Sequence, residues 1–216
     1  MAETRPAALP PAERTVGQVV AEAIRTYGAH FWQVLPLGLV VVGLDVATLH
    51  RGVDTQTLIL WGFAPLFAAA YVRAATVVRN EQWAWPALWA GLVVFLPFPI
   101  LVRLYVLPGI AWFGLLGLSV PAAVAERLGV RDALRRGWQL ARADLLHAIA
   151  GLVTLGLVYF VSRYALLVFI HGFGGQGQTV AGMIADLVLS PLVFVGAVLL
   201  YEDQRARLAL IDRGGD

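Results

Sequence analysis

The sequence has no cysteine and no lysine, and it is poor in charge of either sign. All 16 basic residues are arginine, and charged residues occupy only 14% of the 216 positions. The absence of cysteine excludes disulfide bonds, thiol catalysis and thiolate metal sites. A soluble domain carries about 25% charged residues, so this charge is too small to cover a water-soluble core. Hydrophobic residues make up 59% of the chain and the mean hydropathy is +0.75, which indicates an integral membrane protein.

The chain also lacks the motifs of several enzyme classes. It contains no H-E-x-x-H sequence, no P-loop lysine and no G-x-S-x-G sequence. The only serines are Ser119, Ser162 and Ser190, and the four histidines do not have metal-ligand spacing. Gly172, Gly174 and Gly177 match a dinucleotide fingerprint by spacing, but they lie between apolar runs and outside a βαβ unit, so we interpret them as a turn. We therefore expect no enzymatic activity, no cofactor and no metal.

Six apolar runs are long enough to cross a hydrocarbon core about 30 Å thick. We predict spans at residues 31–49, 57–78, 86–102, 108–125, 145–170 and 180–201. Prolines inside these runs are tolerated where neighbouring helices satisfy the freed carbonyl groups. The predicted fold is an all-α membrane bundle of six transmembrane helices with two interfacial amphipathic helices. We divide the chain into a disordered tail (1–14), one membrane domain (15–210) and a C-terminal tail (211–216).

Residues 126–144 form the only long, strongly charged stretch, and apolar runs lie on both sides of it. On a helix, an apolar stripe would run beside a row of arginines, as in helices that lie in a membrane interface. The stripe comprises Val130, Leu134, Trp138, Ala141 and Leu145. The face expected to contact lipid or a partner comprises Arg131, Arg135, Arg136, Trp138 and Arg142. We predict that this face binds anionic lipid headgroups, and the alternative is that it binds a partner protein. We predict no binding of nucleic acid, because the clustered arginines indicate how the chain is oriented in the membrane.

The apolar stripe has a counterpart near the N-terminus, where Thr15 and Gln18 predict a helix capping box. Stripe positions 16, 20, 24, 27 and 31 recur at 130, 134, 138, 141 and 145, a constant offset of 114. Each stripe precedes a two-span hairpin, so we predict two parallel repeats, over 16–79 and 130–205, related by an axis along the membrane normal.

The distribution of arginine predicts the orientation. With both termini in the cytoplasm, Arg51, Arg103 and Arg163 lie outside and the other 13 of the 16 arginines lie inside. This asymmetry follows the positive-inside rule. We therefore predict a multi-pass protein of a bacterial inner membrane with both termini in the cytoplasm.

Two groups of charges are candidate sites. Charges inside spans cost about 2.5 to 3.5 kcal/mol each on insertion scales, so Asp45, Arg163 and Asp186 should find partners. We predict an ion pair between Arg163 and Asp186, with Asp45 in the same cluster. At the inner boundary we predict a charge network that comprises Glu126, Arg73, Arg79, Asp203 and Arg205.

One residue and two short motifs together resemble the sequence pattern of a known family. The residue is Glu126, and the motifs are Ala-Leu-Arg-Arg-Gly-Trp-Gln-Leu at 133–140 and Leu-Leu-Tyr-Glu-Asp-Gln-Arg-Ala-Arg at 199–207. The pattern resembles the membrane domain that accompanies some bacterial glycerophosphoryl diester phosphodiesterases and related multi-pass proteins. Members of that family usually have serine at the position of Gly137. The resemblance implies a non-catalytic role, because the activity of that family belongs to a separate barrel domain.

Two functions remain open at this level. One is a module that contacts lipid or a partner protein through the interfacial helices. The alternative is a small-solute transporter or channel with a polar site at Asp45, Arg163 and Asp186. A cavity around Asp45 and Asp186 would favour transport, whereas a dry, fully paired interior would favour the module.

Overall fold

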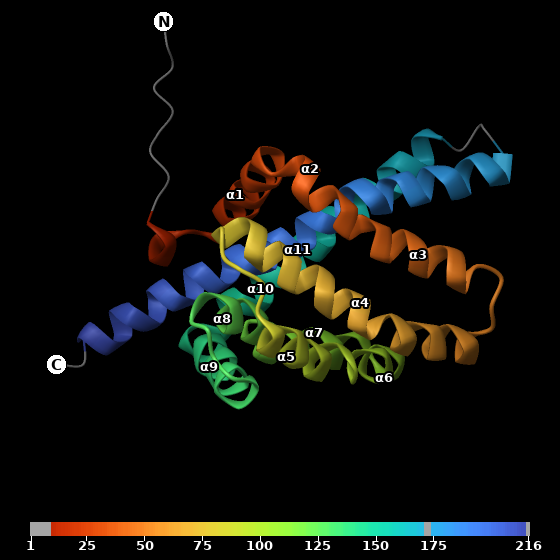
Figure 1. Ribbon diagram of the computed structural model, residues 1–216. Helices are drawn as coiled ribbons and strands as arrows, with labels where there is room; N and C mark the ends of the chain where they lie inside the picture. The colour runs from red at the N-terminus through yellow and green to blue at the C-terminus, as the bar shows by residue number, and fades with distance from the viewer. Residues whose placement is uncertain (1–9, 171–173, 215–216) are drawn as a thin grey trace, which may run out of the picture.

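The computed structural model describes residues 10–170 and 174–214, and within these it contains only helices (Figure 1). The helices are η1 (Pro11–Glu13), α1 (Val16–Ala29), α2 (Phe31–Val34), η2 (Leu35–Leu37), α3 (Gly38–Thr48), α4 (Val53–Arg79), α5 (Trp85–Phe95), α6 (Phe98–Leu104), α7 (Val106–Leu116), α8 (Ser119–Ala125), α9 (Val130–Ala143), α10 (Leu145–Phe169) and α11 (Gly174–Gly214). The predicted all-α fold is confirmed.

Six helical segments are long and apolar enough to cross a membrane. They are Phe31–Thr48, Val53–Arg79, Trp85–Leu104, Leu107–Ala125, Leu145–Phe169 and Gly177–Arg213, close to the six predicted spans. Large apolar side chains cover the outside of the bundle; Leu146 and Phe169, for example, are 83% and 86% exposed. Such a surface suits hydrocarbon rather than water, so the chain is a multi-pass membrane protein.

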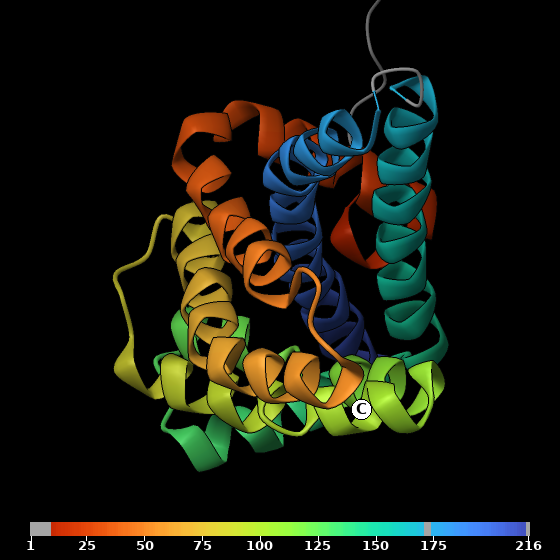
Figure 2. The same ribbon diagram turned by 90° about the vertical axis from the view of Figure 1, so that its right-hand side faces the viewer.

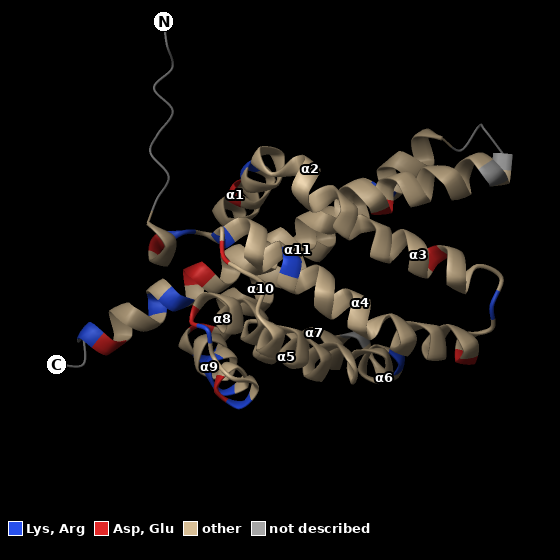
Figure 3. Ribbon diagram, in the orientation of Figure 1, with Lys and Arg blue, Asp and Glu red and all other residues tan. Residues whose placement is uncertain are grey.

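The bundle has two distinct ends. The described chain begins and ends on one side, here called the terminal side, and the link between α3 and α4 lies on the opposite side, here called the far side (Figures 1 and 2). Most charged residues lie towards the terminal side, including those of α9 (Figure 3). This arrangement is the one that the arginine count anticipates for a protein with both ends in the same compartment.

Three of the spans are interrupted. The first is divided at η2, which contains Pro36, and the third is divided between α5 and α6 at Pro97. The fourth is divided between α7 and α8, at Gly117 and Leu118. At the break in the third span, the indole N–H of Trp61 donates to the Leu96 carbonyl (2.8 Å) and that of Trp112 donates to the Val94 carbonyl (2.9 Å). Carbonyls inside a membrane need such donors, so the tryptophans stabilise the interrupted span.

Helix α11 is continuous over 41 residues, which corresponds to about 60 Å. Pro191 lies inside it and has no N–H for the carbonyl of Leu187, four residues earlier. Gly38 of α3 packs directly on that carbonyl: a Cβ at Gly38 would lie 2.8 Å from the Leu187 Cα and closer still to its carbonyl oxygen. The Tyr27 hydroxyl donates to the next carbonyl, that of Val188 (2.7 Å). Burial raises the pKa of Tyr27, so its hydroxyl stays protonated as this donor.

The core combines aromatic rings with small residues. Tyr71 of α4 is fully buried, and its ring lies within 6.3 Å of the ring centroids of Phe95, Phe113 and Phe194. Many of the other buried positions are alanines. Small side chains at helix contacts let backbones approach closely, which is how membrane helices associate without a hydrophobic driving force.

The two segments predicted to be interfacial are helical: α1 and α9 are each 14 residues long and offset by 114 positions. The capping box of Thr15 and Gln18 is present. The predicted stripes are wrong in detail: Ala23 and Gly137 are buried, while Trp138 is 43% exposed. Ile24 is likewise 53% exposed. Large apolar side chains can face lipid as well as the core, so apolar periodicity alone does not identify the buried face.

The internal repeat stays a prediction. The buried positions Val19 and Ala133 are 114 residues apart, as the repeat requires. However, α1 packs against α10 and α11, whereas α9 packs against α5, α7, α8 and α11. Superposing 16–79 on 130–205 is the direct test.

Both ends of the described chain are more ordered than predicted. Residues 1–9 of the predicted disordered tail lie outside the described residues, but Pro11–Glu13 forms η1 and the Arg14 carbonyl accepts a hydrogen bond from Arg207 (2.8 Å). Helix α11 continues into the predicted C-terminal tail at 211–216. It also begins at Gly174, so part of the predicted glycine-rich turn is helix, while 171–173, including Gly172, lie outside the described residues.

Reporter fusions can test the predicted orientation. Fusions after Thr55, Arg103 and Gln176 should report the outer compartment, because these positions fall on the far side. A fusion after Arg136 in α9 should report the cytoplasm. A reversed result at any of the four positions would contradict the orientation, and a full-length C-terminal fusion that reports the cytoplasm is the control.

Candidate functional site

A buried carboxylate forms the centre of the polar cluster inside the spans. Asp186 of α11 is completely buried, and the Nε of Arg163 on α10 donates to both of its oxygens, at 2.8 and 3.0 Å. The Tyr159 hydroxyl also donates to Asp186. The predicted ion pair is therefore present. Tyr159 was missed by sequence reasoning, although it lies four residues before Arg163 and so on the same face of α10.

Asp45 of α3 joins this cluster, as predicted. Its carboxyl group interacts electrostatically with both Asp186 and Arg163. The contact exists because α3 packs along α11, where Gly38 allows their backbones to approach.

A cavity of about 880 Å³ opens beside the cluster on the far side. Asp45 and Arg163 are part of its wall, together with Thr48, Tyr164 and Thr179. The Arg163 side chain is one-third exposed, and its Nε is the atom that holds Asp186. Its two terminal nitrogens have no protein partner among the described residues. The volume lies within the range of about 300 to 1,000 Å³ that is typical of small-molecule sites.

On the terminal side, Glu126 is the centre of a second cluster. Its carboxylate accepts hydrogen bonds from the Nε of Arg136 (3.0 and 3.1 Å) and from the Tyr201 hydroxyl (2.9 Å). Beside it, Arg79 pairs with Glu202 and lies over the Tyr201 ring, 5.8 Å from its centroid. These contacts join the residue and both motifs that carry the family resemblance, because Arg136 lies in 133–140 and Tyr201 in 199–207.

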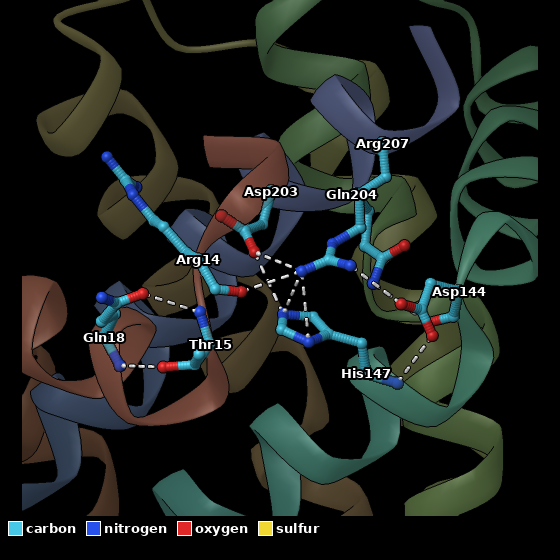
Figure 4. A network of polar contacts seen from close by, with 8 residues as sticks. All are labelled: Arg14, Thr15, Gln18, Asp144, His147, Asp203, Gln204 and Arg207. Atoms are coloured by element: carbon cyan, nitrogen blue, oxygen red, sulfur yellow. Dashed lines mark hydrogen bonds and ion pairs between the residues drawn. The ribbon is translucent and has the colours of Figure 1, made fainter. Parts of the chain in front are cut away.

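A third cluster surrounds Asp203, which is fully buried on α11 (Figure 4). The Nε2 of His147 lies 3.0 Å from its Oδ2, and Arg207 lies 3.7 Å from the same atom. Arg207 also pairs with Asp144 (3.0 Å), which caps α10 through the backbone N–H of His147. The cluster ties α10, α11 and the Arg14 backbone together. The expected contacts of Glu126 and Asp203 with arginine are both present.

Two members of the predicted inner-boundary network lie elsewhere. Arg73 and Arg205 are exposed and make no ion pair among the described residues. Arg207 pairs with Asp203 because it is four residues away on the same helix face, whereas Arg205 is two residues away and points in another direction. Arg73 is likewise six residues from Arg79 and leaves α4 on a different side. His147 and Asp144 were missed, although a carboxylate three residues before a histidine at a helix start is a capping signal.

The exposed face of α9 is close to the predicted lipid face. Arg131, Arg135, Trp138 and Arg142 are all exposed, and their spacing of four, three and four residues places them in one row. Arg136 is the exception, because it points into the bundle towards Glu126. The row lies on the exposed side of α9, and Trp138 and Arg142 in it also border the end of α11.

Gly137 on the opposite face of α9 allows the helix to lie close to α8. A Cβ at Gly137 would lie 2.6 Å from the backbone nitrogen of Ser119, and the Ser119 hydroxyl is closer still. A serine at this position would clash with Ser119, so Gly137 suits the local packing of this chain.

No protein-family model, curated protein or solved structure matches the chain. Within the described residues, no group of three histidine, aspartate or glutamate side chains could hold a metal ion. The resemblance to the phosphodiesterase membrane domain therefore stays a hypothesis that rests on the stretches around Glu126.

Proposed function

We propose that this protein binds a small polar solute in the far-side cavity and moves it across the membrane. One observation carries the proposal: Asp45 and Arg163 form part of the wall of a cavity, with Asp186 buried behind them. Inserting an ionisable residue into a span costs free energy, and such residues usually face a partner or a solute pathway. Here Arg163 pairs with Asp186, and Asp45 and Arg163 also border the cavity.

The charges of the cluster favour a cationic solute. Asp45, Asp186 and Arg163 together carry a formal charge of −1 when both carboxyl groups are ionised. A cation bound at Asp45 would neutralise this charge. The ring of Tyr164 also lines the cavity and could stabilise an organic cation through its face. We therefore propose a small organic cation that binds next to Asp45.

Movement across the membrane would require the terminal side to open. That side is held by the clusters of Glu126 with Arg136 and of Asp203 with His147 and Arg207. In alternating access, one part of a bundle rocks against another around a fixed binding site. The two clusters are the contacts that this motion would have to separate.

We further propose that the protein resides in a bacterial inner membrane with both termini in the cytoplasm and has no catalytic activity of its own. The distribution of arginine supports this orientation, because the sides that face the cytoplasm carry most arginines in membrane proteins. The resemblance at Glu126 and the two motifs supports the bacterial setting and the non-catalytic role.

Solute uptake into proteoliposomes tests the proposal. Choline, glycine betaine and lactate are a cation, a zwitterion and an anion of similar size. We expect the protein to take up choline in preference to the other two, and Asp45→Asn to reduce uptake at least about tenfold, because it removes the charge that receives the cation.

Asp54→Asn is the matched control. Asp54 is an aspartate on the same side of the membrane, but it is exposed, pairs with Arg103 and does not line the cavity. Its uptake should equal that of the unaltered protein. Absence of uptake of all three solutes, with the protein folded, would contradict transport, and equal loss in both variants would contradict the assignment of the site.

A second candidate function is a module that contacts lipid or a partner protein through α9. The exposed row of Arg131, Arg135, Trp138 and Arg142 favours it. This candidate predicts no uptake, and it predicts that a partner is lost from gently purified complexes when the row is neutralised.

A further inference from the structure

A groove of about 490 Å³ lies on the terminal side between α9 and the last turns of α11. Arg136, Trp138 and Arg142 line it from α9, and Leu208, Ile211 and Asp212 line it from α11. The groove exists because α11 continues past the predicted end of the sixth span and its end packs beside α9. It is separate from the far-side cavity and shares no lining residue with it.

The charge of the groove favours an anion. Arg142 is exposed and makes no ion pair among the described residues. Arg136 is held by its Nε on Glu126, which leaves its terminal nitrogens available as donors. Asp212 is the one carboxylate in the lining, against two arginines. Arginine presents paired N–H donors that match the geometry of a phosphate.

Apart from Gln139, the remaining side chains that line the groove are apolar. Ile211 is 55% exposed and Trp138 is 43% exposed, and Leu208 lies beside them. A free phosphate would use the arginines alone and leave these side chains uncovered. A phospholipid would use both, because its acyl chains can cover apolar side chains next to the headgroup. Helix α9 is also rich in arginine and contains Trp138, as is typical of segments that lie at the membrane interface.

We propose that this groove binds one anionic phospholipid, with its phosphate on Arg142 and Arg136 and its acyl chains along Trp138, Leu208 and Ile211. Basic pockets between membrane helices on the cytoplasmic side bind lipid headgroups in this way. The site does not depend on transport through the far-side cavity, because it requires only that α9 and the end of α11 form the groove.

Native mass spectrometry of the purified full-length chain tests the site. The protein is exchanged into micelles that contain equal amounts of phosphatidylglycerol and phosphatidylcholine with identical oleoyl chains. We expect one phosphatidylglycerol to be retained in preference to phosphatidylcholine. Arg142→Gln should lower this retention about fivefold, the effect of about 1 kcal/mol per arginine near a lipid surface. Ile211→Ser should lower retention of the same lipid by removing apolar contact.

Arg131→Gln is the matched control, because Arg131 is an exposed arginine on the same helix but outside the groove. It should retain the lipid like the unaltered protein. Equal retention of the two lipids, or equal loss in the Arg131 and Arg142 variants, would overturn the proposal. Inorganic phosphate that displaces the lipid fully at millimolar concentration would also overturn it, since the site would then recognise the anion alone.

Discussion

Replacing Arg163 by alanine should strongly destabilise the protein in detergent. The substitution leaves Asp186 buried without its ion-pair partner. Breaking a buried pair by removing one member costs about 3 to 5 kcal/mol, and we expect the lower end because the guanidinium is one-third exposed. The thermal midpoint of the purified variant measures the effect. Exchanging the two residues, with aspartate at 163 and arginine at 186, should restore part of the loss.

Arg103→Ala is the control for this experiment. Arg103 also lies on the far side and pairs with Asp54 at 2.6 Å, but the two side chains are 47% and 89% exposed. Exposed pairs contribute about 0 to 1 kcal/mol, so its midpoint should barely change. A normal midpoint for Arg163→Ala together with abolished uptake would contradict the structural role of the pair and leave only a role in transport.

Replacing Gly38 by alanine should have the second large effect. The added Cβ would meet the backbone of Leu187 at 2.7 Å from its carbonyl carbon, and backbone cannot move aside as a side chain can. Overpacking costs about 1 to 3 kcal/mol and occasionally more. Helix α3 would have to shift away from α11 and take Asp45 with it. We therefore expect both a lower thermal midpoint and weaker binding of any solute in the far-side cavity.

Gly156→Ala supplies the comparison, because nothing lies within 4 Å of a Cβ at Gly156 in the interior of α10. Alanine stabilises a helix interior relative to glycine by up to about 1 kcal/mol, so this midpoint should stay the same or rise. If Gly38→Ala behaves like Gly156→Ala, the close crossing of α3 and α11 is not as described.

The spans and the ion pair could be predicted because both depend on distances along the chain. Hydropathy fixes the length of each span, and a hairpin places Arg163 opposite Asp186 at a depth that follows from the helical rise. The partners of Asp203 could not be predicted in the same way. They depend on the rotation of α11, which selects Arg207 and excludes Arg205.

The sequence also could not predict which face of α1 and of α9 is buried against the bundle. A lipid environment accepts Trp138 and Ile24 on the outside, so the apolar stripe no longer identifies the core as it does in water. The cavity beside Asp45 and the groove beside Arg142 arise from the tilts of neighbouring helices and from the length of α11. Neither the tilts nor the packing of the last turns of α11 follows from periodicity.

Helix α11 passes through both proposed binding sites without a break. Asp186 and Gly182 belong to the half that borders the cavity, and Leu208 and Ile211 belong to the half that borders the groove. The helix thus connects the two proposed binding sites, and Gly38 and Tyr27 contact it next to Pro191. If lipid in the groove changes the tilt of α11, it changes the affinity of the cavity for its solute. By thermodynamic reciprocity the solute then changes the affinity for lipid by the same factor. The lipid composition on the terminal side would therefore alter solute binding in the cavity on the opposite side.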